Sequence, residues 1–311
     1  MPIWPNRFLM TMNDSYHRPV LLMESVDGLN IKGDGVYVDA TFGGGGHSRE
    51  ILKRLGKGGS LLAFDRDGDA LGNALEDERF RLIDQNFRYL KNYLKFYGIG
   101  KLDGVLADFG VSSHQFDRAD RGFSTRFDAD LDMRMDQKQE LSAFQVVNSY
   151  SEKDLAGVLF QYGELRNANA MARVLVAARE GGPLETTDQL KQALRQFLPR
   201  MREHKILAQV YQAIRIEVNQ ELEALREFLL QLPDLLVPGG RVSLISYHSL
   251  EDRLVKRFIQ SGNFEGEPKR DFYGNIEVPF KRIGKLIVPS ADEIAANNRA
   301  RSAKLRIAER I

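Results

Sequence analysis

The strongest constraint on the fold is a stretch in which two short apolar runs are joined by a glycine cluster and a helical segment. The first run, VYVDA, covers residues 36–40, and four consecutive glycines follow at positions 43–46. The second run, SLLAFD, covers residues 60–65, and the intervening HSREILKRL has helical spacing. Short apolar runs bounded by glycine are typical of buried strands. The stretch therefore predicts a strand–loop–helix–strand unit.

Two further apolar runs extend this unit into a sheet. Residues 102–110 (LDGVLADFG) and 241–249 (RVSLISYHS) are largely apolar instead of alternating, as in parallel strands that are covered on both faces. Strands that alternate with helical segments predict an α/β fold with a doubly wound, Rossmann-like parallel sheet. Residues 1–16 show no period and predict a loose arm.

Residues 112–213 interrupt the alternation of strands and helices. The stretches 151–164, 167–180 and 186–198 have helical period, and no strand run separates them. A helix–turn–strand pattern returns after residue 214, so the sheet resumes there. We expect a discontinuous domain, 1–111 with 214–311, and an inserted all-helical domain at 112–213 that recognises the substrate.

The composition excludes several classes of site. The 311-residue chain has no cysteine, so it forms no disulfide, thiolate zinc site or cysteine nucleophile, which fits a reducing compartment. No stretch approaches the roughly 20 apolar residues of a membrane span, and we expect a soluble, cytoplasmic protein without a membrane partner. The net charge is only +1, but residues 252–311 hold 13 Lys and Arg against 8 Asp and Glu. This basic end fits RNA contact and fits a solvated surface equally well.

The glycine cluster and a following aspartate form a candidate cofactor site. Glycines such as Gly44 let a ligand lie against bare backbone, and the helix start behind them offers unpaired N–H groups, although a tight turn without a ligand would look the same. Asp65 ends the second run 21 residues after Gly44. About 20 residues are expected before the acid that binds ribose hydroxyls, although Asp65 could also cap a helix. Together these features favour an adenosine-containing cofactor.

Electrostatics narrow the choice of cofactor. Contiguous glycines differ from the G-x-G-x-x-G pattern of dinucleotide sites, which disfavours an NAD-dependent oxidoreductase. Asp39, just before the cluster, would repel a pyrophosphate but would suit a cofactor that carries an ammonium and a sulfonium. This favours S-adenosylmethionine.

Two further residues are candidates for the cofactor site. Phe87 could stack on adenine, although a phenylalanine beside Tyr89 and Leu90 could equally belong to the core. Asp108 ends the strand that otherwise reads Val105-Leu106-Ala107, at the sheet edge where open α/β folds bind ligands, although it could also cap a turn.

Seven blocks together resemble the bacterial family of ribosomal RNA small-subunit methyltransferase H, the cytosine-N4 methyltransferases. In chain order they are VDATFGGGGHS, DFGVSSHQFD, RGFS, LDMRMD, VYQAIRIEVNQEL, ISYHSLEDRLVKRF and NNRARSAKLRIAER. The similarity runs from His17 to Arg310. It implies a class I methyltransferase sheet with an inserted helical domain. It also implies S-adenosylmethionine-dependent N4-methylation of a specific cytosine in 16S ribosomal RNA, in the small ribosomal subunit.

The resemblance also implies a set of cofactor-binding residues that runs from the glycine loop to the methionine end of the cofactor. These are Gly45, Gly46, His47, Asp65, Phe87, Asp108 and Gln115. His114 stands where the family usually has proline, next to Gln115.

Methyl transfer to a cytosine N4 requires alignment and an acceptor for the N4 hydrogens, with no covalent step and no metal. Asp108 is the candidate acceptor. Ser246 and His248 follow another strand at the same edge and could face the target base, although His248 could equally be a structural hydrogen-bonding residue.

The sequence also offers candidate residues for RNA contact and allows an assembly of two copies. Candidate phosphate contacts, which could also be solvated surface, are Arg134, Arg299, Arg301 and Lys304. A homodimer is compatible with the sequence. The competing hypothesis is a non-catalytic RNA-binding or ribosome assembly factor that retains a cofactor pocket, against which the joint presence of Asp65, Asp108 and Gln115 argues.

Overall fold

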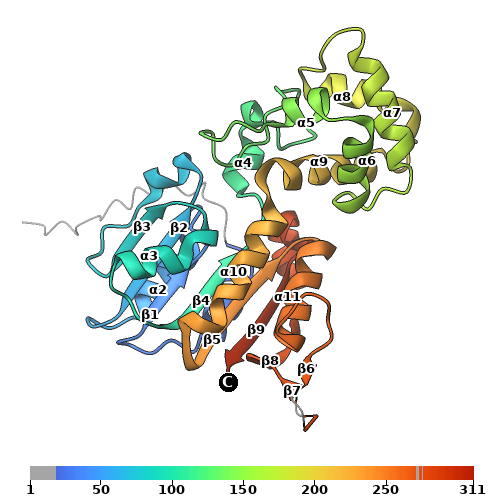
Figure 1. The fold of residues 1–311 in the computed structure, drawn as a ribbon. Helices are drawn as coiled ribbons and strands as arrows, with labels where there is room; N and C mark the ends of the chain where they lie inside the picture. The colour runs from blue at the N-terminus through green and yellow to red at the C-terminus, as the bar shows by residue number, and fades with distance from the viewer. Residues whose placement is uncertain (1–18, 271–272, 275) are drawn as a thin grey trace, which may run out of the picture.

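The computed structural model describes residues 19–270, 273–274 and 276–311. The loose arm predicted at residues 1–16 lies outside these residues. Figure 1 shows a sheet with helices packed against it and a helical lobe at one end of the strands. None of the helices in the described part of the chain is long and apolar enough to cross a membrane.

Seven strands form one sheet in the order β3–β2–β1–β4–β5–β9–β8. Their bounds are β1 Val36–Asp39, β2 Ser60–Asp65, β3 Phe80–Asp84, β4 Leu102–Asp108, β5 Leu236–Ser246, β8 Phe280–Ile287 and β9 Lys304–Arg310. The strands from β3 to β5 are parallel, which confirms the predicted doubly wound α/β sheet. A separate hairpin pairs β6 (Lys269–Arg270) with β7 (Ile276–Glu277).

The antiparallel end of the sheet was not predicted from the sequence. β9 pairs with β5 in antiparallel register, and β8 pairs in the same way with β9. Most side chains of β8 are exposed, so this edge strand has no apolar run that would mark it in the sequence.

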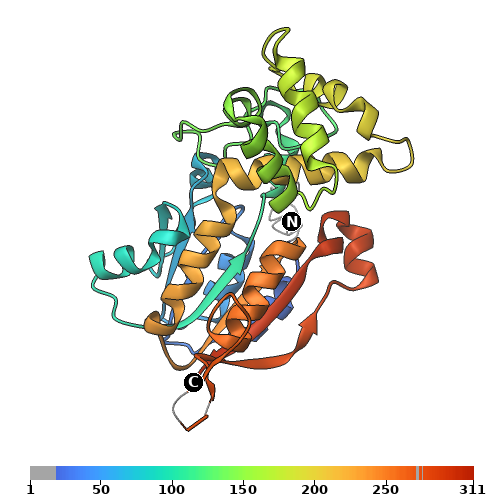
Figure 2. The same cartoon turned by 45° about the vertical axis from the view of Figure 1, so that its right-hand side comes forward.

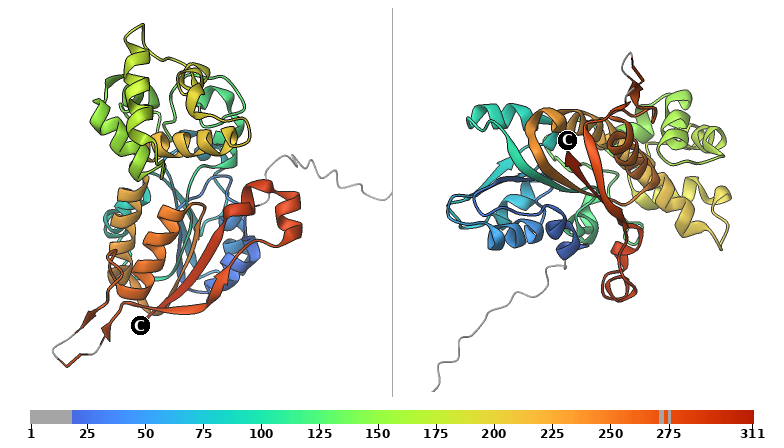
Figure 3. Two further views of the ribbon diagram at one scale, coloured as in Figure 1. Left: turned by 90° about the vertical axis from the view of Figure 1, so that its right-hand side faces the viewer. Right: turned by 90° about the horizontal axis from the view of Figure 1, so that it is seen from below.

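Helices cover both faces of the sheet (Figure 3), and the side chains on each face form an apolar core. The bounds of these helices are α1 Leu22–Gly28, α2 Gly46–Arg54, α3 Leu90–Phe96, α10 Glu221–Leu235 and α11 Ser249–Ser261. Val26 of α1 and Ile51 of α2 pack with Leu106 of β4 on one face. Phe228 of α10 and Phe258 of α11 belong to the core on the other face. Burial on both faces explains why the central strands read as apolar throughout.

The helical lobe lies beyond the carboxyl ends of the parallel strands (Figure 2). Its helices are α4 Ser113–Asp117, η3 Ala119–Arg121, α5 Ala143–Ser149, α6 Glu152–Gln161, α7 Ala168–Arg179, α8 Thr187–Ala193, η4 Arg195–Phe197 and α9 Glu203–Asn219. They enclose a core of their own around Leu155, Leu175 and Ile214. Residue 213, the last residue of the predicted insertion, lies inside α9, which continues to Asn219 and meets α10 across Gln220.

The remaining elements are short: η1 Gly68–Asn73, η2 Phe87–Tyr89, α12 Ala291–Ala296 and η5 Asn298–Ser302. The last two connect the antiparallel strands β8 and β9 at the edge of the sheet that faces the lobe.

A buried arginine joins the lobe to the sheet. The Arg121 side chain is 2% exposed, and its Nη1 donates to Asp69 at 2.9 Å and lies 3.3 Å from Oδ1 of Asp67, just after β2. Its Nη2 donates to the carbonyls of Arg134 at 2.9 Å and Met135 at 3.2 Å. One guanidinium thus connects the loop after β2 with two segments of the lobe.

We predict that Arg121→Met lowers the free energy of unfolding by about 3–5 kcal/mol, because it leaves the buried Asp67 carboxylate without its charged partner. The matched control is Arg118→Met. Arg118 pairs with Asp120 at 2.8 Å, but both side chains are about half exposed, so its loss should lower the free energy of unfolding far less. Urea unfolding of both variants measures the difference, and equal losses would contradict the role of Arg121.

Candidate active site

A cavity of about 1020 Å³ lies between the carboxyl edge of the sheet and the lobe. Its walls come from the glycine loop after β1, the ends of β2 and β4, the loop after β5, and α9. Carboxyl ends of parallel strands are where open α/β sheets bind ligands, so this cavity is the candidate active site.

The glycine loop presents bare backbone to this cavity. Gly43 and Gly45 adopt φ angles of +52° and +74°, which favour glycine. A Cβ on Gly43 would meet nothing within 4 Å, whereas a Cβ on Gly46 would lie 2.1 Å from Pro19 Cγ. Gly43, Gly44 and Gly46 line the cavity, and Gly45 does not. The loop therefore leaves open space for a ligand at Gly43 and needs a residue without a Cβ at Gly46.

Asp65 lies at the end of β2 and lines the cavity, as its spacing from the glycines predicts. Its Oδ2 accepts the Gly43 N–H at 2.7 Å, and its Oδ1 accepts the Asp67 N–H at 2.9 Å. Burial raises the pKa of its carboxyl to about 6. A carboxylate has about four acceptor positions, so these two bonds leave room for the hydroxyl pair of a ribose.

Asp39 ends β1, as predicted. Its side chain is fully buried and does not line the cavity. Its carboxylate accepts hydrogen bonds from the Ser48 hydroxyl at 2.6 Å and from the Thr41 N–H at 3.1 Å. These two bonds hold the two ends of the glycine loop in place. Burial raises its pKa to about 6. The structure thus gives Asp39 a part in holding the loop, whereas its predicted contact with a cofactor stays a prediction.

His47 and Phe87 both line the cavity. His47 Nε2 lies 3.2 Å from the Val20 carbonyl, and burial lowers the pKa of the imidazole, which favours its neutral form. The Phe87 ring packs edge-on against Phe109 and Phe228, with centroid distances of 5.9 and 5.1 Å. Phe87 is therefore both part of the core and part of the cavity wall.

Asp108 lines the cavity at the end of β4. Tyr247 donates its hydroxyl to Asp108 Oδ1 at 2.7 Å, and the Asp108 N–H donates to Thr41 Oγ1 at 2.6 Å. Within the residues that the structure describes, Asp108 Oδ2 accepts no hydrogen bond. Burial raises the pKa of this carboxyl to about 6. Tyr247 was not predicted from the sequence, although its place between Ser246 and His248 after a strand could have indicated it.

Ser246 and His248 frame this tyrosine but differ in position. Ser246 is buried at the end of β5 and does not line the cavity. His248 lines the cavity and also caps the start of α11. Its ring Nδ1 accepts the backbone N–H of Glu251 at 3.5 Å, and the Glu251 carboxylate accepts the backbone N–H of His248. His248 therefore has the structural hydrogen-bonding role that the sequence allowed, and its contact with a target base stays a prediction.

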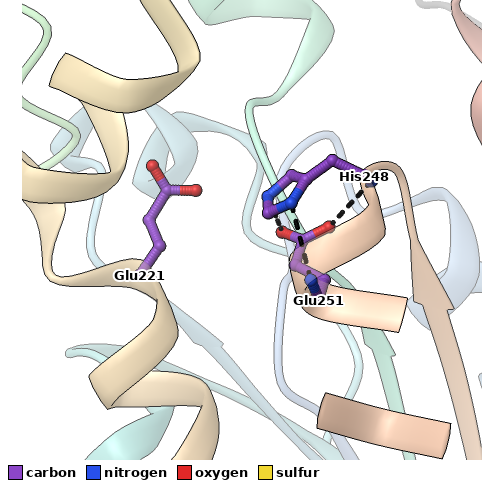
Figure 4. Close-up of side chains that lie close together, drawn as sticks. All are labelled: Glu221, His248 and Glu251. Carbon is purple, nitrogen blue, oxygen red and sulfur yellow. Dashed lines mark hydrogen bonds and ion pairs between the residues drawn. The ribbon is translucent and has the colours of Figure 1, made fainter. Parts of the chain in front are cut away.

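Two carboxylates approach His248, as Figure 4 shows. Three atoms lie within 4.8 Å of one another: one carboxylate oxygen of Glu221, one of Glu251 and one ring nitrogen of His248. Divalent cations bind donor sets of this kind. However, Arg215 donates to both oxygens of Glu221, at 2.8 and 2.9 Å. A guanidinium thus already neutralises Glu221, and this cluster is best described as an ion-pair network in the cavity wall.

The remaining predicted residues are mostly engaged within the protein. Gln115 lines the cavity, and its Nε2 donates to Asp67 Oδ2 at 2.6 Å. Arg134 binds Asp132 and two backbone carbonyls, and Lys304 binds Asp252 at 3.2 Å; neither lines the cavity. Arg299 lines the cavity and pairs with Asp117. Arg301 is exposed.

The doubly wound sheet, the glycine loop and the strand-end carboxylates form a Rossmann-like cofactor site beneath a helical lobe. The chain belongs to the MraW methylase family, whose model matches residues 14–311, and is therefore a methyltransferase that uses S-adenosylmethionine.

Named relatives cover nearly the whole chain. The ribosomal RNA small subunit methyltransferase H of Flavobacterium johnsoniae is 66% identical over 97% of this chain and 100% of its own length. The protein of the same name from Christiangramia forsetii is 64% identical over 95% of this chain and 98% of its own length. The protein of the same name from Cytophaga hutchinsonii is 57% identical over 95% of this chain and 99% of its own length.

We predict that Asp65→Ala weakens S-adenosylmethionine binding by about 1.5–3 kcal/mol, because a charged hydrogen-bond acceptor is lost, and that the fold is kept. Asp84→Ala is the matched control. Asp84 ends the neighbouring strand β3 directly opposite Asp65, binds Lys138 and does not line the cavity. Isothermal titration calorimetry should show a change in the first variant and not in the second. Unchanged affinity in Asp65→Ala would remove Asp65 from the site.

The pH dependence of cofactor binding gives a separate prediction. Burial raises the pKa of Asp65 and of Asp108 to about 6, so both carboxyls are largely protonated at pH 5 and ionised at pH 7. The ionised forms attract a cation, so we expect the affinity for S-adenosylmethionine to rise between pH 5 and pH 7.

The stability of the cofactor-free protein should change in the opposite direction. Because the folded pKa exceeds the unfolded value of about 4, these carboxyls stabilise the fold below pH 4, and that contribution is lost as the pH rises through 6. Calorimetric affinities and urea unfolding at pH 5, 6 and 7 measure both trends. A cofactor affinity that falls with pH would contradict the assignment, and Asp65→Ala should show the shallower rise.

Proposed function

We propose that the protein transfers the methyl group of S-adenosylmethionine to the N4 amine of a cytosine in 16S ribosomal RNA. The proposal is supported by membership of the MraW methylase family and by the relatives that are named as small-subunit rRNA methyltransferases. The observation that carries it is the Asp108 carboxylate, which faces the cavity beside the glycine loop with Oδ2 free of hydrogen bonds within the described residues.

The geometry suits a reaction that needs an acceptor more than a strong base. S-adenosylmethionine supplies an already activated methyl group, whereas the N4 lone pair of cytosine is delocalised into the ring. Asp108 Oδ2 would accept one N4 hydrogen and stabilise the positive charge that develops on nitrogen. Tyr247 holds Oδ1 at 2.7 Å, so the carboxylate is oriented before the substrate arrives.

The cofactor would occupy the half of the cavity formed by the glycine loop, Asp65 and Phe87. The target base would enter from the other half, which Tyr247 and His248 line. The helical lobe closes this side of the cavity, which supports its proposed role in recognising the substrate. We propose that residues 112–213 form this substrate-recognition domain and interrupt the sheet domain of residues 1–111 and 214–311. We further propose that the RNA is presented within the small ribosomal subunit, in the cytoplasm.

The alternative is an RNA-binding or ribosome assembly factor without catalysis. A methyl-transfer assay on purified 16S rRNA and on intact small subunits, with the modified base mapped by mass spectrometry, separates the two. Transfer to one cytosine N4 supports the proposal. Cofactor binding without transfer to either form of the RNA would overturn it.

We predict that Asp108→Asn slows single-turnover methyl transfer by roughly 10²–10³-fold, because the amide keeps the size but loses the negative charge. Cofactor affinity should change much less. The control is Asp103→Asn. Asp103 lies near the start of the same strand, at the amino edge of the sheet, where it binds Lys32 and the Val36 N–H. A near wild-type rate at saturating cofactor would assign the acceptor role to another group.

A further inference from the structure

The lobe carries a cluster of cations at its outer end, which we call the basic tip. It consists of Arg195, Arg200, Arg202 and Lys205. All four side chains are exposed, and within residues 19–270, 273–274 and 276–311 none of them forms an ion pair or a side-chain hydrogen bond. Met201, in the middle of this segment, is 93% exposed. The tip therefore holds positive charge that the described protein does not neutralise.

The local field at the tip is positive. Its one nearby acid within the segment, Glu203, is already bound by Lys191 at 2.8 Å. This bond, together with the charges of Lys191, His204 and Arg195, lowers the pKa of the Glu203 carboxyl. The tip also lies at the first turn of α9, whose dipole places partial positive charge there.

One face of α9 connects the tip to the cavity. Lys205, Ala208, Gln212 and Arg215 follow one another at intervals of three or four residues, so they share a face of the helix. The last three line the cavity, and Lys205 belongs to the tip. At 1.5 Å per residue, the face runs about 15 Å from Lys205 to Arg215. Figure 1 shows α9 running from the outer part of the lobe to its junction with α10.

The tip differs in this respect from three of the cations that the sequence singled out. Arg134, Arg299 and Lys304 each pair with an aspartate of the same protein. A cation that is already paired must lose its partner before it can bind a phosphate, whereas a free exposed cation only releases water and counterions.

We propose that the basic tip binds the sugar–phosphate backbone of the RNA strand that flanks the methylated nucleotide, and that this strand runs along the face of α9 that leads from Lys205 past Ala208 to the cavity. The proposal rests on the function proposed above. A stacked strand carries one phosphate about every 3.4 Å, so the distance from Arg215 to Lys205 corresponds to about four or five nucleotides. The small side chain of Ala208 leaves room for the strand where it enters the cavity. The tip then contacts phosphates and contributes affinity without reading sequence.

The first experiment removes the charge of the tip. The triple variant R200Q/R202Q/K205Q is compared with K57Q/K95Q/K256Q, which removes the same charge from exposed, unpaired lysines of the sheet domain within the described residues. Dissociation constants for 16S rRNA are measured by filter binding between 50 and 300 mM KCl, about the range in which phosphate contacts are screened. Calorimetry with S-adenosylmethionine shows that each variant keeps its cofactor site.

The tip variant should bind RNA at least about tenfold more weakly at the lowest salt concentration. Its slope of log K against log salt should fall by about 2 to 3, because each phosphate contact contributes roughly 0.7–0.9. Its single-turnover rate at saturating RNA should stay near wild type. A tip variant that matches the control in affinity and slope overturns the proposal. Failure of the wild-type protein to methylate rRNA would instead overturn the proposed function, and the binding data would still decide the role of the tip.

The second experiment tests the path along α9. Ala208→Trp places a large ring on the exposed face between the tip and the cavity, whereas Ala170→Trp places the same ring on an exposed position of α7 that does not line the cavity. The first variant should lower kcat/KM for RNA by at least about tenfold with cofactor affinity unchanged, and the second should have little effect. Equal behaviour of the two variants would show that the strand does not follow this face.

Discussion

The loops that leave β1 and β2 are held together by the carboxylate of Asp65. One oxygen accepts the N–H of Gly43 and the other accepts the N–H of Asp67. Asp67 in turn accepts from Gln115 and lies within reach of both terminal nitrogens of Arg121, which also binds the backbone of the lobe. A continuous series of hydrogen bonds thus runs from Asp65, the residue proposed to bind the ribose, to the lobe that would receive the RNA. The shape of the cofactor half and the position of the lobe depend on the same few polar groups.

Burial gives these groups their chemistry. The carboxyls of Asp39, Asp65 and Asp108 all lie at strand ends, and desolvation raises the pKa of each to about 6. A cationic cofactor would recover part of the cost of ionising them, so cofactor binding and carboxylate ionisation favour one another. The hydroxyl of Tyr247 has a different effect on Asp108, because it occupies one carboxylate oxygen, whereas the other accepts no hydrogen bond within the described residues. Preorganisation of this kind reduces the reorganisation needed when the substrate arrives.

The parts of the site that follow strands could be predicted from the sequence. Asp65 and Asp108 end apolar runs, and parallel strands end at one edge, so both carboxylates reach the same cavity. The features that could not be predicted from the sequence depend on side-chain direction. Asp39 also ends a strand, yet it points into the protein toward Ser48. Tyr247 follows a strand end but carries no motif of its own, and only its contact with Asp108 reveals it. The β8 strand escaped prediction because an exposed edge strand needs no apolar run.

The sequence by itself determined the parallel part of the sheet, the position of the glycine loop, the helical character of the lobe and the family, because local period and residue type decide these properties. Only the tertiary structure decided which charges are free. Arg299 pairs with Asp117, which is 182 residues away, and Lys304 pairs with Asp252, which is 52 residues away. The cations of the basic tip meet no such partner within the described residues. Neutralisation depends on distances of a few ångströms between segments that folding brings together, and no local pattern in the chain encodes those distances.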